Sequence, residues 1–321
     1  MSRIRPYLRL LRAPAVPTAA SNILMGYLVA NGSWTPAVPL AILLLASIGI
    51  YTAGMVLNDV VDADEDRRLR PHRPIPSGEI KQNTARRIGW SLLSGGVVLS
   101  FAAGWIGRFF DTDVVVWKSG AIGMCLGLAV VAYNFWLKKY WFGTIVLGVC
   151  RCLNVLLGMS VGMGTASQSA FGFTPLQWSI AGGIGVYIVG LSVLARREAD
   201  EVRRGQIAIS LSLMAIAIVW LASLIWRSGD FRLQWLSPDK KSVASSLFVI
   251  IFIPVLTRIL RAFSSKNAAH VQRAVTSSLF SLVIIDAILC AAVGAGQTLL
   301  PILVALLIIP SYVLSRWAYA T

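Results

Sequence analysis

Residues 37–66 read AVPLAILLLASIGIYTAGMVLNDVVDADED, an apolar run that leads directly into a cluster of acids. A helix needs about 20 predominantly apolar residues to cross about 30 Å of hydrocarbon. The run from 37 to 58 meets that length without one charged side chain. It therefore predicts a membrane-spanning helix whose acidic end emerges at the membrane surface.

The rest of the chain repeats this apolar pattern. Of its 321 residues 56% are hydrophobic and 13% are charged, about half the charged fraction of a soluble domain. We predict an all-α, polytopic transmembrane bundle of nine to ten helices, forming a single domain over 1–321. The last window contains Pro301 and Pro310, so it could also be a re-entrant or surface helix. The predicted windows are 14–31, 37–58, 87–107, 114–137, 142–164, 176–195, 207–226, 243–262, 272–295 and 298–317.

The net charge of +15 follows the predicted topology. Most Lys and Arg fall in the N-terminal segment and in alternate gaps between apolar runs, which places those segments in the cytoplasm. We therefore expect an integral membrane protein with a cytoplasmic N-terminus and active site, and no nucleic-acid partner. The basic start lacks a small-residue cleavage site, which favours an uncleaved first span. Four cysteines in apolar runs and two histidines argue against disulfides and a histidine-rich metal site.

The acidic cluster has helical spacing. Asn58, Asp62 and Asp66 are four residues apart, so they form one polar stripe about 12 Å long. Carboxylates on one stripe repel each other unless a cation lies between them, and oxygen ligands suit Mg²⁺ shared with substrate phosphates. We predict Asn58, Asp59, Asp62 and Asp66 as metal ligands. The alternative is a solvated acidic helix end that binds no metal.

A basic, proline-stiffened segment follows the acids: RRLRPHRPIPSG, residues 67–78. Such cations can bind phosphate oxygens. The alternative is positive-inside charge in contact with anionic lipids.

NDxxDxxxD followed by RPIPSG resembles the first signature of the UbiA superfamily of intramembrane prenyltransferases. The resemblance includes Arg12-Ala13-Pro14, Tyr133 with Lys138, and an acidic loop after the predicted helix 176–195. It implies that Mg²⁺ holds the diphosphate of an isoprenoid donor beside an apolar tunnel. It also implies that Asn58, Asp62 and Asp66 bind metal or diphosphate, and that four cations contact the donor: Arg12, Arg70, Arg73 and Lys138.

The second expected motif departs from that superfamily's pattern. It has two aspartates four apart before a glycine, whereas this chain has READEVRRG at 197–205. Glu198, Asp200 and Glu201 are the candidate metal ligands here, and Arg197 is a candidate diphosphate contact. With this departure, the chain resembles a divergent, EboC-like branch of the superfamily.

The predicted activity is Mg²⁺-dependent transfer of a polyprenyl group from its diphosphate to an aromatic or other lipophilic acceptor within the bilayer. Asp62, Asp66 and Tyr133 are the candidate catalytic residues. Ring faces can stabilise an allylic cation, and the candidates are Tyr133, Phe135, Trp136 and Tyr187. The alternatives are a membrane transporter, which would spread its charges across the bilayer depth, and another lipid-modifying enzyme such as a CDP-alcohol phosphotransferase.

Arg151 and Asp286 fall near mid-membrane in the predicted helices. A charge there costs at least about 2.5 to 3.5 kcal/mol on insertion scales, so each needs a partner. We expect them to pair directly or through Asn154. The pair could lock two helices together, or Arg151 and Asn154 could hold a polar group of the acceptor.

Overall fold

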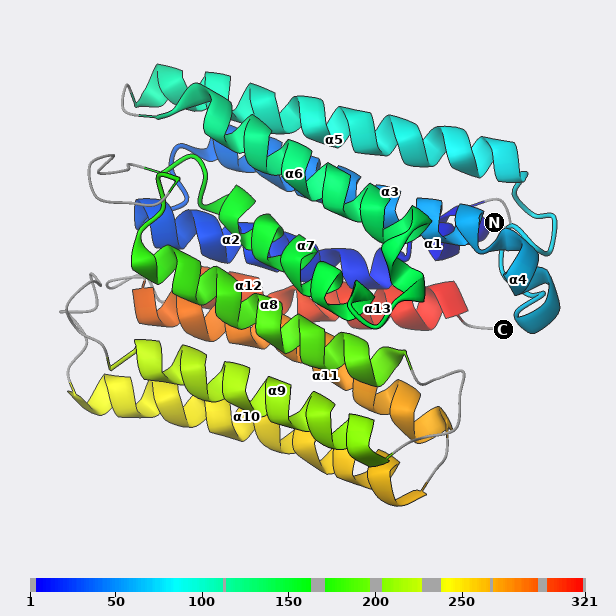
Figure 1. Cartoon of the computed structure of the whole chain (residues 1–321). Coiled ribbons are helices and arrows are strands. Elements are labelled where there is room, and N and C mark those ends of the chain that lie inside the picture. The colour runs from blue at the N-terminus through cyan, green and yellow to red at the C-terminus, as the bar shows by residue number, and fades with distance from the viewer. Residues whose placement is uncertain are drawn as a thin grey trace.

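The computed structural model describes residues 4–111, 114–162, 171–196, 204–226, 238–265, 268–293 and 299–319. Within these ranges, long helices lie side by side in one bundle (Figure 1). The helices are α1 (Arg5–Leu10), η1 (Ala13–Ala15), α2 (Val16–Asn31), α3 (Ala37–Val61), α4 (Ala63–Leu69), α5 (Gln82–Phe110), α6 (Val116–Phe135), η2 (Leu137–Lys139), α7 (Gly143–Gly158), α8 (Pro175–Ala195), α9 (Arg204–Leu224), α10 (Pro238–Ser265), α11 (Ala268–Val293), α12 (Leu299–Leu306) and α13 (Ile308–Tyr319).

The predicted membrane fold is confirmed. Among the described residues there are eight candidate spans that are long and apolar enough to cross a membrane, and α7 is a shorter apolar helix. Every apolar window of the sequence corresponds to a helix, or to the α12–α13 pair at the C-terminal end. The chain is an all-α integral membrane protein, and its helix number lies close to the nine to ten expected.

Helix α2 lies at the centre of the bundle. It packs against α3, α7 and α11, while α5 and α10 lie on opposite outer sides of it (Figure 1). Its buried side chains include the polar Thr18, Ser21 and Asn22. Polar groups inside a membrane normally face other helices, so these residues mark α2 as the helix around which the interior is built.

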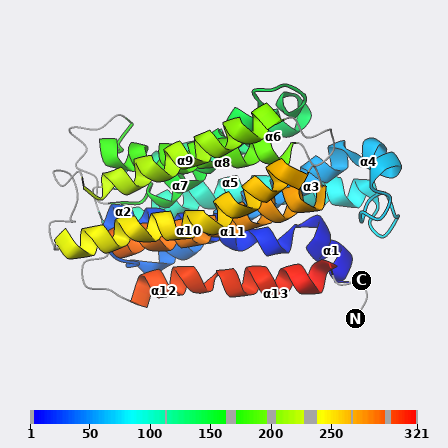
Figure 2. The same cartoon turned by 90° about the horizontal axis from the view of Figure 1, so that it is seen from below.

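The C-terminal window forms two helices. Pro310 has no N–H to donate to the carbonyl of Leu306, which accounts for the break between α12 and α13. Figure 2 shows the pair running along one flank, parallel to the long helices. Only 11% of this candidate span is buried, which indicates a lipid-facing position.

Two glycines allow α2 and α7 to touch backbone to backbone. A Cβ on Gly26 would lie 2.6 Å from the carbonyl oxygen of Val155, and one on Gly158 would lie 2.8 Å from that of Ile23. Small residues commonly permit such close crossings of membrane helices. The crossing brings the polar side chains of α2 within reach of α7.

We predict that Gly26→Ala destabilises the fold by about 1 to 3 kcal/mol, because the added methyl group must push α2 away from α7. Gly95→Ala is the matched control, since a Cβ there meets nothing within 4 Å. Thermal unfolding in detergent measures both. Equal melting temperatures for the two variants would contradict the close crossing.

Candidate active site

The end of α3 keeps the predicted polar stripe together. Asp62 lies between α3 and α4, with φ −85° and ψ 1°. Its N–H donates to the Asn58 carbonyl at 2.9 Å, and the Asp66 N–H donates to the Asp62 carbonyl at 2.8 Å. These hydrogen bonds keep the helical four-residue spacing through the junction, so the three side chains remain neighbours.

The loop after α4 folds back onto α3. Helix α4 ends because Arg70 precedes Pro71, and the residue before a proline is pushed out of the helical region. Its backbone is accordingly non-helical, at φ −143° and ψ 60°. Ile75 and Ile80 then bury themselves in a small apolar cluster, which fixes the returning loop. The cluster consists of Leu10, Val56, Val60, Ala63, Ile75, Ile80 and Ala85.

Arg73, anchored by that loop, contacts two buried carboxylates at once. Its Nη1 lies 3.2 Å from Asp59 Oδ1 and 2.6 Å from Asp66 Oδ2. Asp59 is 5% exposed and Asp66 is 3% exposed. A buried charge is costly unless it is paired and hydrogen-bonded. Arg73 therefore gives both buried carboxylates a cationic partner.

Two further cations approach the acids. Arg12 Nη2 lies 3.3 Å from Asp59 Oδ1, and Lys138 contacts Asp62 directly from η2. Arg70 is more remote, 3.9 Å from Asp66, and its side chain is 41% exposed. The structure thus brings the predicted acids and cations together at one end of the bundle, with the cations contacting carboxylates.

Arg12 has an unusual backbone. It adopts the left-handed region at φ 47° and ψ 47°, between α1 and η1. For a residue other than glycine this costs of order 1 kcal/mol or more, and such strain often accompanies functional sites. The conformation reverses the chain so that the Arg12 side chain reaches both Asp59 and the pocket described next.

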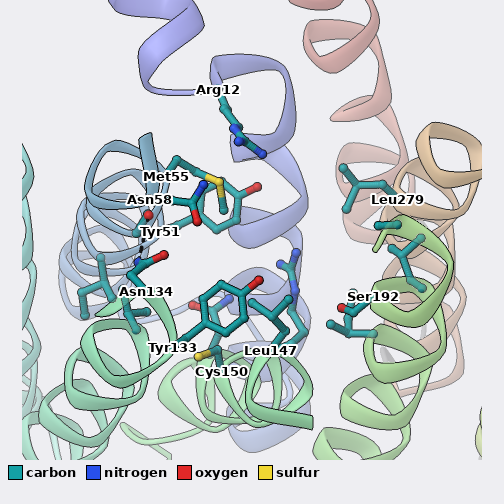
Figure 3. A pocket seen from close by; sticks show the side chains of 18 of the residues that line it. Arg12, Tyr51, Met55, Asn58, Tyr133, Asn134, Leu147, Cys150, Ser192 and Leu279 are labelled. Atoms are coloured by element: carbon teal, nitrogen blue, oxygen red, sulfur yellow. Dashed lines mark hydrogen bonds between the residues drawn. The ribbon is translucent and has the colours of Figure 1, made fainter. Parts of the chain in front are cut away.

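A pocket of about 360 Å³ opens beside these charges. Figure 3 shows Tyr51 and Tyr133 projecting into it from two walls, with Leu279 and Ser192 facing them across the opening. Asn58 and Arg12 line the same pocket, whose remaining walls are mostly apolar side chains of α3, α6, α7, α8 and α11.

Of the four aromatic side chains predicted to lie around the reacting cation, Tyr133 alone lines this pocket. Phe135 and Trp136 are exposed on the outside, Trp136 at 62%. Tyr187 is fully buried elsewhere, with its hydroxyl 2.7 Å from that of Ser281. The prediction that the last three surround a reacting cation was wrong, because position near a helix end does not determine which face a side chain occupies.

Sequence reasoning missed Tyr51 and Asn134. Tyr51 precedes Asn58 by seven residues, close to two helical turns, so the same stripe extended backwards would have found it. Asn134 donates to the Gly54 carbonyl at 3.1 Å. Its buried Oδ1 has no hydrogen-bond partner among the residues described.

The interior charges are linked by a residue that the sequence did not suggest. Arg151 Nη1 donates to Asn22 Oδ1 at 3.0 Å, and Asn22 Nδ2 donates to Asp286 Oδ2 at 2.7 Å. No direct ion pair joins Arg151 to Asp286 within the described residues. The prediction of a direct or Asn154-mediated pair was wrong, because α2 lies between α7 and α11.

Asn154 is used in a different way. Its Oδ1 accepts from Ser47 at 2.6 Å, and its Nδ2 donates to the Ala19 carbonyl at 3.1 Å. It thereby connects α7 to both α3 and α2 while lining the pocket.

The candidate residues of the second acidic motif are Arg197, Glu198, Asp200 and Glu201. They lie outside the described residues. Their roles stay predictions.

The oxygen groups near the pocket fit a shared Mg²⁺ site. Within the described ranges, no three acidic, histidine or cysteine side chains form a metal cage of their own. Mg²⁺ usually binds through one or two carboxylates and completes its shell with phosphate oxygens and water. Asn58 in the pocket wall and the partly exposed Asp62 can supply such a half-shell.

The fold and the site define a polytopic α-helical membrane protein with a mostly apolar pocket beside a cluster of charged side chains at one end of the bundle. A sequence model of the UbiA prenyltransferase family matches residues 19–321. The chain belongs to the UbiA prenyltransferase family.

Curated relatives match part of the chain. A digeranylgeranylglyceryl phosphate synthase of Sulfolobus acidocaldarius is 34% identical over 147 residues, 44% of this chain and 52% of the relative. A protoheme IX farnesyltransferase of Caulobacter vibrioides is 27% identical over 175 residues, 53% of this chain and 49% of the relative. The chain thus spans about half the length of these relatives.

Solved structures share the fold over a longer stretch. A UbiA homolog from Aeropyrum pernix K1 gives a TM-score of 0.62 at 17% identity, covering 86% of this chain and 96% of its own. A UbiA homolog from Archaeoglobus fulgidus, bound to GPP and Mg²⁺, gives 0.60 at 15% identity, covering 94% and 99%.

We predict that Arg73→Met lowers the free energy of unfolding by about 3 to 5 kcal/mol, because it leaves two buried carboxylates without their main partner. Arg67→Met is the control. Arg67 pairs with the highly exposed Asp64, and such surface pairs contribute about 0 to 1 kcal/mol. Chemical unfolding in detergent compares the two. A similar small loss in both variants would show that Arg73 does not stabilise the acids.

Proposed function

We propose that this chain is a single prenyltransferase domain that moves a polyprenyl group from its diphosphate to an aromatic or other lipophilic acceptor inside the membrane. The observation that carries this proposal is the pocket itself. Oxygen ligands and basic side chains meet at one end of a mostly apolar cavity within a membrane bundle. A molecule with a charged diphosphate at one end and a hydrocarbon tail matches this cavity, because its charge would lie beside the polar groups and its tail along the apolar walls.

Family membership supports the same reaction class. Relatives in this family carry the names of digeranylgeranylglyceryl phosphate synthase and protoheme IX farnesyltransferase. Structures of a family member with the same fold were solved with GPP or DMAPP and Mg²⁺. We infer that a prenyl diphosphate is also the donor here.

The proposed reaction needs little covalent chemistry from the protein. The C1–O bond of the donor breaks and its electron pair leaves with the diphosphate. The acceptor's electron pair forms the new bond to C1, and its proton passes to diphosphate or water. Mg²⁺, when bound, would neutralise the leaving diphosphate. The protein's part is to supply fixed countercharge and a dry cavity around the reacting carbon.

The described residues divide these tasks. Asn58 and Asp62 would hold Mg²⁺, while Arg12 and Lys138 would bind diphosphate oxygens. Arg73 serves as a positioning residue, since it already holds Asp59 and Asp66 in ion pairs.

The ring of Tyr133 stands in the pocket wall and would face the carbon that becomes electron-deficient. Tyr51 projects into the same space (Figure 3). Mostly apolar walls complete the cavity and would exclude water, which would otherwise capture that carbon.

We further propose that the N-terminus and the active site face the cytoplasm. Helices α1 and α4 and the C-terminal end of α13 lie at the same end of the bundle (Figure 1). This end also carries the basic loop after α4, and an excess of Lys and Arg marks cytoplasmic loops.

We predict that Asp62→Asn lowers prenyl transfer by about 10²-fold or more, because a carboxylate that would hold the Mg²⁺ neutralising the leaving diphosphate is lost. Asp64→Asn is the control, since Asp64 is exposed on α4 and, within the described part of the chain, pairs with Arg67 alone. Transfer of label from radiolabelled geranylgeranyl diphosphate to membrane extract measures both. Wild-type turnover by Asp62→Asn would remove the proposed catalytic site.

We predict that EDTA abolishes the transfer and that Mg²⁺ restores it, because the donor's diphosphate is a poor leaving group without a bound cation. The melting temperature should change little on chelation, since the acids are already paired with side chains of the protein. Full activity in EDTA would contradict the proposed use of Mg²⁺.

A further inference from the structure

The C-terminal helix α13 packs mainly against η1, the short helix Ala13–Ala15. It also contacts α1 and α2, and Figure 2 shows it running along the flank of the bundle to the end where α1 and α4 lie. The two segments come from opposite ends of the chain. Their contact places α13 directly beside Arg12, the residue that precedes η1.

One face of α13 is turned toward the bundle. Ser311 is 0% exposed, and Ile308 and Leu314, three residues before and after it, are half-buried. Ile309 and Val313 on the opposite side are exposed, Val313 at 55%. Residues three and four apart share one face of a helix. Ser311 therefore lies at the middle of the inward face.

Ser311 suits this contact because it is small. Its hydroxyl donates to the Leu307 carbonyl one turn earlier, at 3.2 Å. Small side chains allow membrane helices to approach closely. The size of Ser311, rather than its polarity, therefore sets how closely α13 approaches the segments that it covers.

The backbone of Arg12 depends on its surroundings. A residue other than glycine keeps a left-handed conformation, here φ 47° and ψ 47°, only where neighbouring structure holds it. On one side, the Arg12 N–H donates to the Arg9 carbonyl at 3.1 Å, and Leu10 is buried in the small apolar cluster. On the other side, the Ala15 N–H donates to the Arg12 carbonyl at 2.9 Å, and α13 packs against η1. Helix α13 thus supports one of the two flanks of Arg12.

The C-terminal helix pair buries little other surface. Only 11% of the span Leu299–Arg316 lies inside the bundle. Membrane helices associate through packing, without a hydrophobic driving force between them, so a helix with so little buried surface adds little to global stability. Its contact with η1 is better explained by a local role.

We propose that α13 positions Arg12 for the diphosphate of the donor, and that Ser311 is the positioning residue of this contact. This inference rests on the proposed prenyl transfer, in which Arg12 binds diphosphate oxygens. Arg12 Nη2 lies 3.3 Å from Asp59 Oδ1, and the side chain lines the pocket. A larger side chain at position 311 would push α13 away from η1, relax the Arg12 backbone and withdraw its guanidinium from the donor site.

Equilibrium binding of radiolabelled geranylgeranyl diphosphate and Mg²⁺ to the purified full-length protein tests this inference without an acceptor. Ser311→Leu should raise the Kd about fivefold, which is part of the rise of about tenfold or more expected for Arg12→Gln when a charged hydrogen bond is lost. Ser311→Ala should keep the wild-type Kd, because it stays small. Val313→Leu is the matched control, since it adds bulk on the exposed face. Ser311→Val adds less volume and serves as the test variant if Ser311→Leu does not fold.

A double variant separates positioning of Arg12 from general loosening of the fold. If Ser311 acts through Arg12, adding Ser311→Leu to Arg12→Gln should leave the Kd of Arg12→Gln unchanged, because the affected contact has already been removed. Competition experiments locate the effect on the donor. In Ser311→Leu, inorganic diphosphate should lose affinity by the same factor as the donor, whereas geranylgeraniol, which lacks the diphosphate, should not.

An unchanged Kd in Ser311→Leu or in Arg12→Gln overturns this inference while leaving prenyl transfer intact. A further loss in the double variant, as large as that of Ser311→Leu alone, also overturns it, because α13 would then act on the pocket by another route. A loss in Ser311→Ala equal to that in Ser311→Leu contradicts the role of side-chain size. If neither geranylgeranyl diphosphate nor the shorter geranyl diphosphate bound to the wild-type protein, the proposed function itself would be rejected.

Discussion

Arg73 connects the loop after α4 to the end of α3 by contacting Asp59 and Asp66 together. Both acids are buried, and burial of a carboxylate is costly unless it is paired and hydrogen-bonded. Burial of Ile75 and Ile80 fixes the loop, and the fixed loop delivers the arginine. Apolar packing thereby determines how the charges pair at this end of the bundle. Of the three residues of the polar stripe, Asn58 is the one that lines the pocket.

The interior of the bundle handles charge in a different way. At the end of α3, acids meet cations directly, whereas Arg151 and Asp286 are separated by the amide of Asn22. The difference follows from helix packing. Gly26 and Gly158 bring α2 so close to α7 that a side chain of α2 occupies the space between the two charges. The amide bridges the two charged groups, while Asp286 Oδ1 has no hydrogen-bond partner among the described residues.

The fold was predictable because most of the apolar runs are long enough to span the membrane by themselves. The stripe of Asn58, Asp62 and Asp66 was predictable because four-residue spacing is a local property of a helix. The partners of these acids were not predictable. Arg73 reaches them only through the return of a loop that packs against α1, α3 and α5. Asn22 was missed for the same reason, since its role exists only where three helices meet.

The balance of charge at the end of α3 offers a second argument that the proposed donor would bind together with Mg²⁺, besides the oxygen ligands that Mg²⁺ prefers. Asp59, Asp62 and Asp66 are already matched by the cations that contact them. A diphosphate entering alone would add several negative charges to a nearly neutral region of low dielectric, where each uncompensated charge is costly. If Arg12 and Lys138 turned toward the phosphates, Asp59 and Asp62 would lose countercharge. In the proposed reaction a divalent cation would offset the added negative charge, and Asn58 and Asp62 are the residues that would hold it. The proposed site therefore needs additional positive charge to bind a diphosphate, because its basic side chains are already paired with acids.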